Sequence, residues 1–154
     1  MDSNYQIQQY TSQFFASQLI NLEWVQPGNG EHHIFPVTSD LHDPAGHVLV
    51  TAYALLRPDG EWSLMVVNKD QENPHPVHIV FHDAKTSRDR YFIGPVSVVT
   101  FGSEQYQWHS NEKGGIADPD GPAAKSTLMA DANTVYGLPK ASVTVIRGKV
   151  ATGR

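Results

Sequence analysis

The spacing of apolar residues predicts one helix near the N-terminus. Phe15, Leu19 and Leu22 recur at intervals of three or four residues, which places them on one face of a helix. Thr11 or the serine after it can cap the first turn, and a Pro-Gly pair closes the segment. The pattern therefore indicates a helix over Ser12–Trp24, preceded by eleven polar, Gln-rich residues that form a frayed lead-in.

After Gly30 the pattern changes to short apolar runs separated by turn residues. The separators are rich in Pro, Gly, Asp and Asn, and they include "DPAG", "RPDG", "KDQENPHP" and "AKTSRD". Strands and turns at such regular intervals are typical of an antiparallel β-sandwich or barrel. The predicted fold is mainly β, an antiparallel β-sandwich of immunoglobulin-like or jelly-roll-like type, with one short N-terminal helix.

Two of the runs indicate how their strands are placed. His47 to Leu56 is apolar at both odd and even positions, which predicts a central strand covered on both faces. In the run that ends in "VHIVFHD", Val77, Ile79 and Phe81 alternate with more polar neighbours. That alternation predicts a strand with one face toward the core and the other nearer water.

The second half of the chain contains a long polar insertion. Residues 91–108 are predicted to form two strands, broken at Gly94-Pro95 or at Gly102. The turn-rich stretch "HSNEKGGIADPDGPAAKS" follows, and the last two strands are expected at roughly 127–136 and 141–150. A loop of this length inside a compact domain is either functional or disordered, which makes residues 110–122 a candidate functional segment.

Composition and charge exclude several classes of function. The 154 residues fit one domain and contain no cysteine, so disulfides, thiolate zinc sites and cysteine nucleophiles are excluded. With 16 acidic and 11 basic residues and no basic stripe, the chain lacks the footprint of a nucleic-acid binder. No apolar run approaches the roughly 20 residues of a membrane helix, and the N-terminus does not resemble an export signal.

Neither the histidines nor the acidic turn forms a recognisable metal motif. On one strand His78 and His82 share a face but stand roughly 13 Å apart, too far to bind one ion. "DPDG" resembles the start of a calcium loop, but Pro122 and Met129 occupy the fifth and twelfth positions of that loop. No metal and no cofactor are expected.

Exposed aromatic residues are the remaining candidates for binding. No Gly-x-Ser-x-Gly or Ser-x-x-Lys motif is present, although a pair of carboxylates for sugar hydrolysis remains open. An indole is a good platform for a sugar ring. Core packing is the preferred role for Trp62. For Trp108, core packing and sugar binding are equally favoured. Trp108 with Asp118 and Asp120 of the adjoining loop forms the candidate carbohydrate site.

Four segments together resemble a known group of enzymes. They are "FFASQLINLEWVQPGNGEHHIFP", "VLVTAYALLRPDGEWSLMVVNKD", "YQWH…ADPDGP" and "LPKASVTVIRG". Over nearly the whole chain, from about Phe14 to Val150, the sequence is similar to the C-terminal part of bacterial family 39-like glycoside hydrolases, a group that includes β-xylosidases.

The resemblance implies an accessory role. Enzymes of this group carry their catalytic acid and nucleophile on a (β/α)8 barrel, beside which a β-sandwich packs. The resemblance places residues 1–31 at the end of a missing barrel and residues 32–154 in the sandwich. The family's acid lies in an Asn-Glu-Pro motif, whereas Asn111-Glu112 is followed by Lys113. No catalytic residue carries over, so this chain alone is not expected to be an enzyme, and its parent is expected to be a glycoside hydrolase.

The partners follow from that hypothesis. If the barrel is missing, the helix exposes an apolar face that would bind the barrel, drive self-association or fold back on the sandwich. That face comprises Phe14, Phe15, Leu19, Leu22 and Trp24. The rival hypotheses are a carbohydrate-binding module that uses Trp108 and residues 110–122, and a small self-sufficient glycosidase. Location stays undetermined, with a secreted or periplasmic parent implied by the resemblance.

Overall fold

The computed structural model describes residues 6–151, which form one helical segment and twelve strands. The helical segment comprises α1 (Ser12–Gln18) and a π-helical extension, η1 (Leu19–Trp24). The strands are β1 (His33–Phe35), β2 (Val50–Leu56), β3 (Trp62–Asn68), β4 (His75–His78), β5 (Phe81–Asp83), β6 (Arg88–Arg90), β7 (Phe92–Gly102), β8 (Tyr106–His109), β9 (Ile116–Asp120), β10 (Ala124–Ala130), β11 (Val135–Leu138) and β12 (Ser142–Val150). Within the described residues, no helix is long and apolar enough to cross a membrane.

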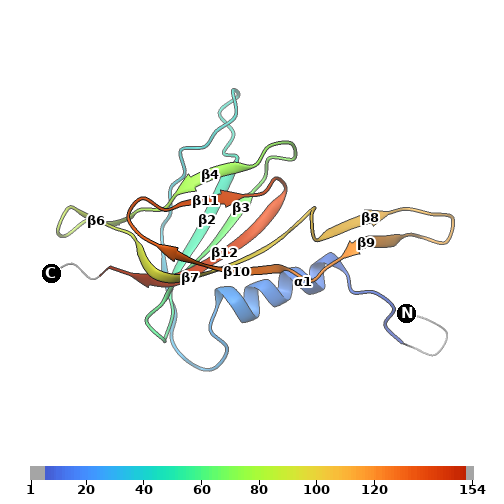
Figure 1. The fold of residues 1–154 in the computed structure, drawn as a ribbon, viewed down its shortest axis with the longest axis horizontal. Coiled ribbons are helices and arrows are strands. Elements are labelled where there is room, and N and C mark those ends of the chain that lie inside the picture. The colour runs from blue at the N-terminus through green and yellow to red at the C-terminus, as the bar shows by residue number, and fades with distance from the viewer. Residues whose placement is uncertain (1–5, 152–154) are drawn as a thin grey trace.

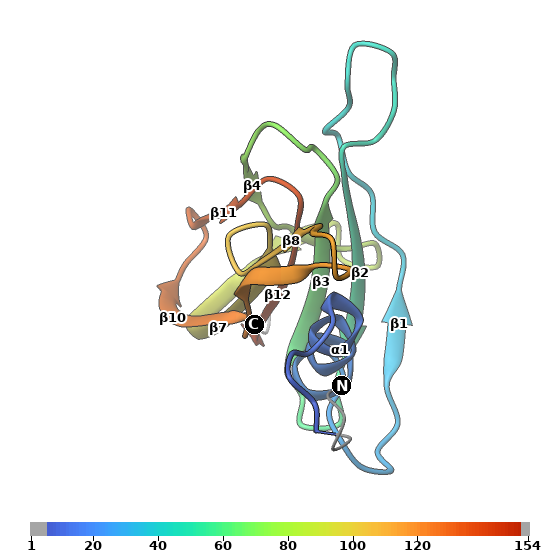
Figure 2. The ribbon, with the colours of Figure 1, turned by 90° about the vertical axis from the view of Figure 1, so that its right-hand side faces the viewer.

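Six strands form one antiparallel sheet in the order β1-β2-β3-β12-β7-β10. The two-stranded pairs β11-β4 and β5-β6 lie over one face of this sheet, and α1 lies over the other (Figure 1). The β8-β9 hairpin extends away from the body, while β1 forms one edge of the sheet (Figure 2). The mainly β, antiparallel sandwich with one short helix is therefore confirmed.

Each face of the sheet has its own core because side chains alternate along the strands. One cluster, on the side of β4 and β11, includes Leu64, Phe92 and Ile146, none more than 5% exposed. The other cluster joins Val99 and Val145 to the helix. The predicted alternation of Val77, Ile79 and Phe81 is confirmed, since all three pack against the first cluster.

The helix begins and ends where the apolar spacing predicts. Thr11 is the N-cap, and its Oγ1 accepts a hydrogen bond from the backbone N–H of Phe14 at 3.4 Å. Leu22 does not lie on the face that packs on the sheet with Phe15 and Leu19, since this side chain is 53% exposed. The last turn is π-helical, with the Val25 N–H donating to the Ile20 carbonyl. This wider turn rotates Leu22 away from the α-helical position that the spacing assumes.

Glu23 anchors the end of the helical segment to the sheet. Its backbone oxygen accepts hydrogen bonds from Arg57 Nη1 and Arg147 Nη1, each at 3.0 Å. Its carboxylate also pairs with Arg147 at 3.4 Å and with Lys125. Arginines at a helix C-terminus satisfy a carbonyl that has no partner within the helix. The helix is thus held on the sheet by an apolar contact and by ion pairs.

Three predicted strands were wrong in extent. The run through Val77 and Phe81 is two strands, β4 and β5, which pair with β11 and β6 respectively. The run 127–136 is also two strands, because a turn from Asp131 to Thr134 separates β10 from β11. The strand predicted from His47 is β2, which begins at residue 50. It is the second strand of the sheet, between the edge strand β1 and β3. Short apolar runs do not show where a chain changes partners.

Candidate functional site

The long polar insertion forms most of a β-hairpin. Strands β8 and β9 pair antiparallel, with Trp108 opposite Ala117 and His109 opposite Ile116. Gly114 and Gly115, which lie between the two strands, both have positive φ, and this lets the chain reverse direction from β8 to β9. A Cβ on Gly115 would lie 2.4 Å from the indole of Trp108. The indole therefore lies directly against the glycine backbone, and it is still 58% exposed.

The hairpin does not place Asp118 on the same face as Trp108. Asp118 follows Ala117 and so points away from the face that carries Trp108. His109 Nε2 donates to the Asp118 backbone oxygen at 2.9 Å. Asp120 lies at the base of the hairpin, opposite Tyr106. Trp108 is thus an isolated aromatic platform on an arm that projects from the domain (Figure 1).

The lead-in segment is tied to this arm. The Gln9 side chain donates from Nε2 to the Ala117 carbonyl at 2.9 Å, and its Oε1 accepts from the Ala117 N–H at 3.1 Å. Gln9 Nε2 also lies 3.4 Å from Asp120 Oδ2. One side-chain amide thus bonds both backbone groups of Ala117 and ties the hairpin to the N-terminal segment.

The five helix residues predicted to meet a partner are divided between core and surface. Phe15 is 6% exposed and Leu19 is 2% exposed, because both pack on the sheet. Trp24 is half-buried, and its Nε1 donates to the Tyr53 carbonyl at 3.2 Å. Phe14 and Leu22 remain exposed, at 37% and 53%. Only part of the predicted interface is therefore open to another molecule.

Several carboxylates build turns. His47 lowers the pKa of Asp43 through hydrogen bonds from its ring and its backbone N–H. The backbone N–H of Lys85 donates to Asp83 and lowers the pKa of that carboxyl. In both cases the ionised form is the one that accepts the hydrogen bonds. These acids are suited to fixing loops.

Asp70 occupies the most heavily bonded of these turns. Its Oδ1 accepts from the N–H groups of Glu72 and Asn73 at 2.9 and 3.0 Å, and its Oδ2 lies 2.9 Å from His75 Nε2. The backbone hydrogen bonds, first of all that from Glu72, hold the pKa of Asp70 far below its usual range. The Asp70 carbonyl accepts from the Ala141 N–H, so this turn also joins the turn before β12.

We expect Asp70→Asn to lower stability in a pH-dependent way. A depressed folded-state pKa contributes stability that is complete above the unfolded-state pKa, near 4, and is lost as pH falls toward the folded-state value. Urea unfolding of both proteins, from about pH 5 to about pH 2.5, should therefore show a difference that shrinks as pH falls. A difference that stays constant over this range would contradict the assignment.

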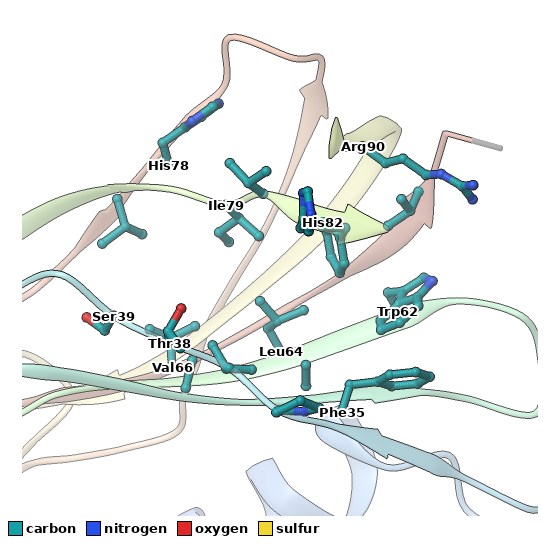
Figure 3. A pocket seen from close by; sticks show the side chains of 18 of the residues that line it. Phe35, Thr38, Ser39, Trp62, Leu64, Val66, His78, Ile79, His82 and Arg90 are labelled. Atoms are coloured by element: carbon teal, nitrogen blue, oxygen red, sulfur yellow. The ribbon is translucent and has the colours of Figure 1, made fainter. Parts of the chain in front are cut away.

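A groove of about 1030 Å³ lies between the sheet and the segment that carries β4 and β5. Its floor is aliphatic and comes from β2 and β3, including Ala52, Leu64 and Val66. Trp62 and Phe35 lie at one end, with Arg90 and His82 across the opening from Trp62 (Figure 3). The two layers of the sandwich leave this space because β4 and β5 cover only part of the sheet.

Sequence reasoning missed this groove. Trp62 was expected in the core, and it does pack against the first core cluster, but it also lines the groove. Phe35, Trp62 and Phe81 come from three different strands, so their meeting depends on strand order. The alternation of Phe81 with His82 was the one local signal for a rim with an apolar side and a polar side.

The described residues contain no group of three or more His, Asp or Glu side chains that could hold a metal ion. Two of the histidines instead contact neighbouring segments. His82 Nδ1 pairs with Asp89 at 2.8 Å, and His78 Nε2 donates to the Ala132 carbonyl at 2.8 Å. These contacts join neighbouring turns and strands.

No family model matches the sequence, and no curated protein matches it. Among solved structures, the GH51 α-L-arabinofuranosidase of Thermotoga petrophila RKU-1 has a TM-score of 0.42 and 14% identity, over 68% of this chain and 20% of that one. An α-L-arabinofuranosidase of Thermotoga maritima has a TM-score of 0.42 and 15% identity, over 66% of this chain and 19% of that one.

A third neighbour is a protein of unknown function from Acinetobacter sp. ADP1, with a TM-score of 0.26 and 12% identity, over 77% of this chain and 87% of that one. This chain spans about a fifth of the length of each arabinofuranosidase. The first of these enzymes belongs to family 51 and not to the family 39-like group expected from the sequence. All three scores are below 0.5 and describe a partial likeness.

Proposed function

We propose that this chain is a non-catalytic accessory β-sandwich of a glycoside hydrolase, and that it braces a (β/α)8 catalytic barrel. The resemblance of its sequence to the C-terminal part of family 39-like enzymes supports the proposal. The observation that carries it is the double anchoring of the helix, through Phe15 and Leu19 and through Glu23. A domain joined before this helix would be held in one orientation relative to the sandwich.

Four of the acidic residues are suited to a structural role rather than a catalytic one. The acids with shifted pKa values, Asp43, Asp59, Asp70 and Asp83, all have the pKa lowered. A glycosidase of the usual two-carboxylate type needs a general acid whose pKa is raised, so that it stays protonated near neutral pH. The shift of these four groups is in the opposite direction.

The exposed outer face of the helix is the surface that the barrel would cover. We expect the chain to form a one-to-one complex with the barrel of a family 39 β-xylosidase that has been produced without its own sandwich. Leu22→Asp should weaken this complex, because it places a charge on the 53% exposed apolar position. Light scattering coupled to size exclusion measures the complex directly.

Val135→Asp is the matched control for this experiment. Val135 is 58% exposed and lies in β11, on the face of the sheet opposite the helix. The proposal requires that Leu22→Asp weakens the complex and that Val135→Asp does not. No complex, or equal weakening by both variants, would count against the helix as the docking surface.

A carbohydrate-binding module is the second candidate, and the exposure of Trp108 favours it. The indole rests on Gly115 and presents its other side to solvent at 58% exposure, as a sugar platform requires. Isothermal calorimetry with xylo- and cello-oligosaccharides tests this role. Saturable heat that disappears in Trp108→Ala would establish it, whereas an absence of heat would leave the bracing role as the account of this domain.

A further inference from the structure

The groove between the two layers exposes apolar side chains that the domain itself does not cover. Phe35, Val37 and Val80 line it and are 39%, 38% and 45% exposed. Its volume of about 1030 Å³ lies at the upper end of the range typical of small-molecule sites. An open apolar groove of this size is large enough to bury most of a small ligand.

Aromatic rings form one wall of this groove. The Phe35 and Trp62 rings lie 4.7 Å apart between centroids, and those of Trp62 and Phe81 lie 5.0 Å apart. Rings at these distances and tilts attract one another beyond simple burial. A flat aromatic ligand that entered over Trp62 would extend this stack.

A cation lies across the opening from that wall (Figure 3). Arg90 donates from Nη2 to Asp83 Oδ2 at 2.8 Å, and its Nε is buried with no hydrogen-bond partner. Lys85 adds a second cation to the lining. Of the two lining acids, Asp83 is already paired with Arg90. The other, Asp40, is the chain neighbour of Ser39, which lies at the end of the groove away from Trp62 (Figure 3).

We infer that this groove binds a small planar aromatic carboxylate, with its ring system against Trp62 and its carboxylate on Arg90. A guanidinium is the side chain best matched to a carboxylate, which it can bind through two nitrogens. The inference goes beyond the bracing role and does not depend on it, because the groove lies on the face of the sheet opposite the helix.

The floor of the groove favours an aromatic acid over a sugar. Val50, Ala52 and Leu64 provide apolar surface without side-chain hydrogen-bonding groups. Sugar hydroxyls buried against such a floor would lose water without gaining a partner, and that loss is costly. An aromatic ring loses no hydrogen bonds on that floor, and its carboxylate would meet Arg90 at the end near Trp62.

The test uses 2-naphthoate as the probe, with naphthalene-2-methanol as its neutral analogue and xylobiose as the sugar, in calorimetric titrations of the full chain. Ala52→Trp fills the floor of the groove with a bulky side chain. Tyr53→Trp is its matched control, since the next residue of β2 points to the opposite face and is 50% exposed. Circular dichroism checks that each variant is folded.

We expect saturable binding of 2-naphthoate that is lost in Ala52→Trp and retained in Tyr53→Trp. Arg90→Met should weaken 2-naphthoate about tenfold or more, the usual effect of losing a charge-assisted hydrogen bond, and should change naphthalene-2-methanol by less than about twofold. Because the neutral analogue reports on the groove alone, it separates loss of charge from loss of fold.

Several results would overturn the inference. Failure of 2-naphthoate to bind, or binding that survives Ala52→Trp, would show that the groove is not its site. Equal affinity for the acid and the alcohol would overturn the role of Arg90. Binding of xylobiose that Ala52→Trp abolishes, without binding of 2-naphthoate, would reassign the groove to sugars. None of these results bears on the complex with a barrel.

Discussion

Phe15→Ala is expected to lower the free energy of unfolding by about 3–5 kcal/mol, the usual cost of removing a buried phenylalanine. The ring of Phe15 lies 5.4 Å from that of Phe101 and 6.2 Å from that of Tyr106, between centroids. Gly121 packs so closely on it that a Cβ there would lie 2.4 Å from the ring. Removing the ring leaves a cavity that these rigid neighbours cannot fill. Urea unfolding at neutral pH measures the loss.

Phe14→Ala is the matched control, one residue earlier on the same helix. Phe14 is 37% exposed and stacks on Tyr10 with 4.1 Å between ring centroids. Its removal should cost at most about 1.5 kcal/mol, the upper range for such an aromatic pair. Equal losses for the two variants would mean that the helix does not pack on the sheet through Phe15, and the rigid joint to a barrel would have no basis.

Asn68→Ala is expected to cost about 2–3 kcal/mol, because it removes a buried amide that serves several backbone groups. Asn68 is 2% exposed, and its Nδ2 lies within hydrogen-bond distance of the carbonyls of Asn73 and Pro139, at 3.2 and 2.9 Å. Its Oδ1 accepts from the Asp70 N–H at 3.1 Å. Alanine would leave buried backbone groups without partners at the junction of two turns.

Asn21→Ala is the comparison for this change. Asn21 donates from Nδ2 to the Ser17 carbonyl at 2.8 Å, but it is exposed, so water can replace the lost bond. Its loss should stay within about 0.5 kcal/mol, as for most surface substitutions. If thermal unfolding showed similar losses for both asparagines, the junction built on Asn68 would not be a stabilising element.

Local patterns predicted the elements whose causes are local. The cap at Thr11 and the spacing of Phe15 and Leu19 depend on neighbours within one or two helical turns, and both are confirmed. The place of Leu22 does not follow from spacing, because the π-helical turn coincides with the anchoring of Glu23 by Arg57, which follows β2, and by Arg147 of β12. No spacing rule contains that contact.

In the candidate sites too, features with local causes could be predicted and features that depend on distant strands could not. The exposure of Trp108 follows from its place beside a polar, Gly-rich turn, which the sequence displays. The β8-β9 hairpin was not predicted from the sequence. Its pairing depends on a tight reversal at Gly114 and Gly115, within a stretch whose composition is typical of a loop. The groove near Trp62 could not be predicted, since it arises from the incomplete cover of one sheet by another.

The most direct test of the bracing role is the half-life of β-xylosidase activity at elevated temperature, for a family 39 barrel without its sandwich, alone and with this chain. A brace that covers the apolar face of the barrel stabilises it by mass action, so the account predicts a longer half-life with the chain and no hydrolysis of an aryl xyloside by the chain alone. An unchanged half-life, or turnover by the chain itself, would contradict the account.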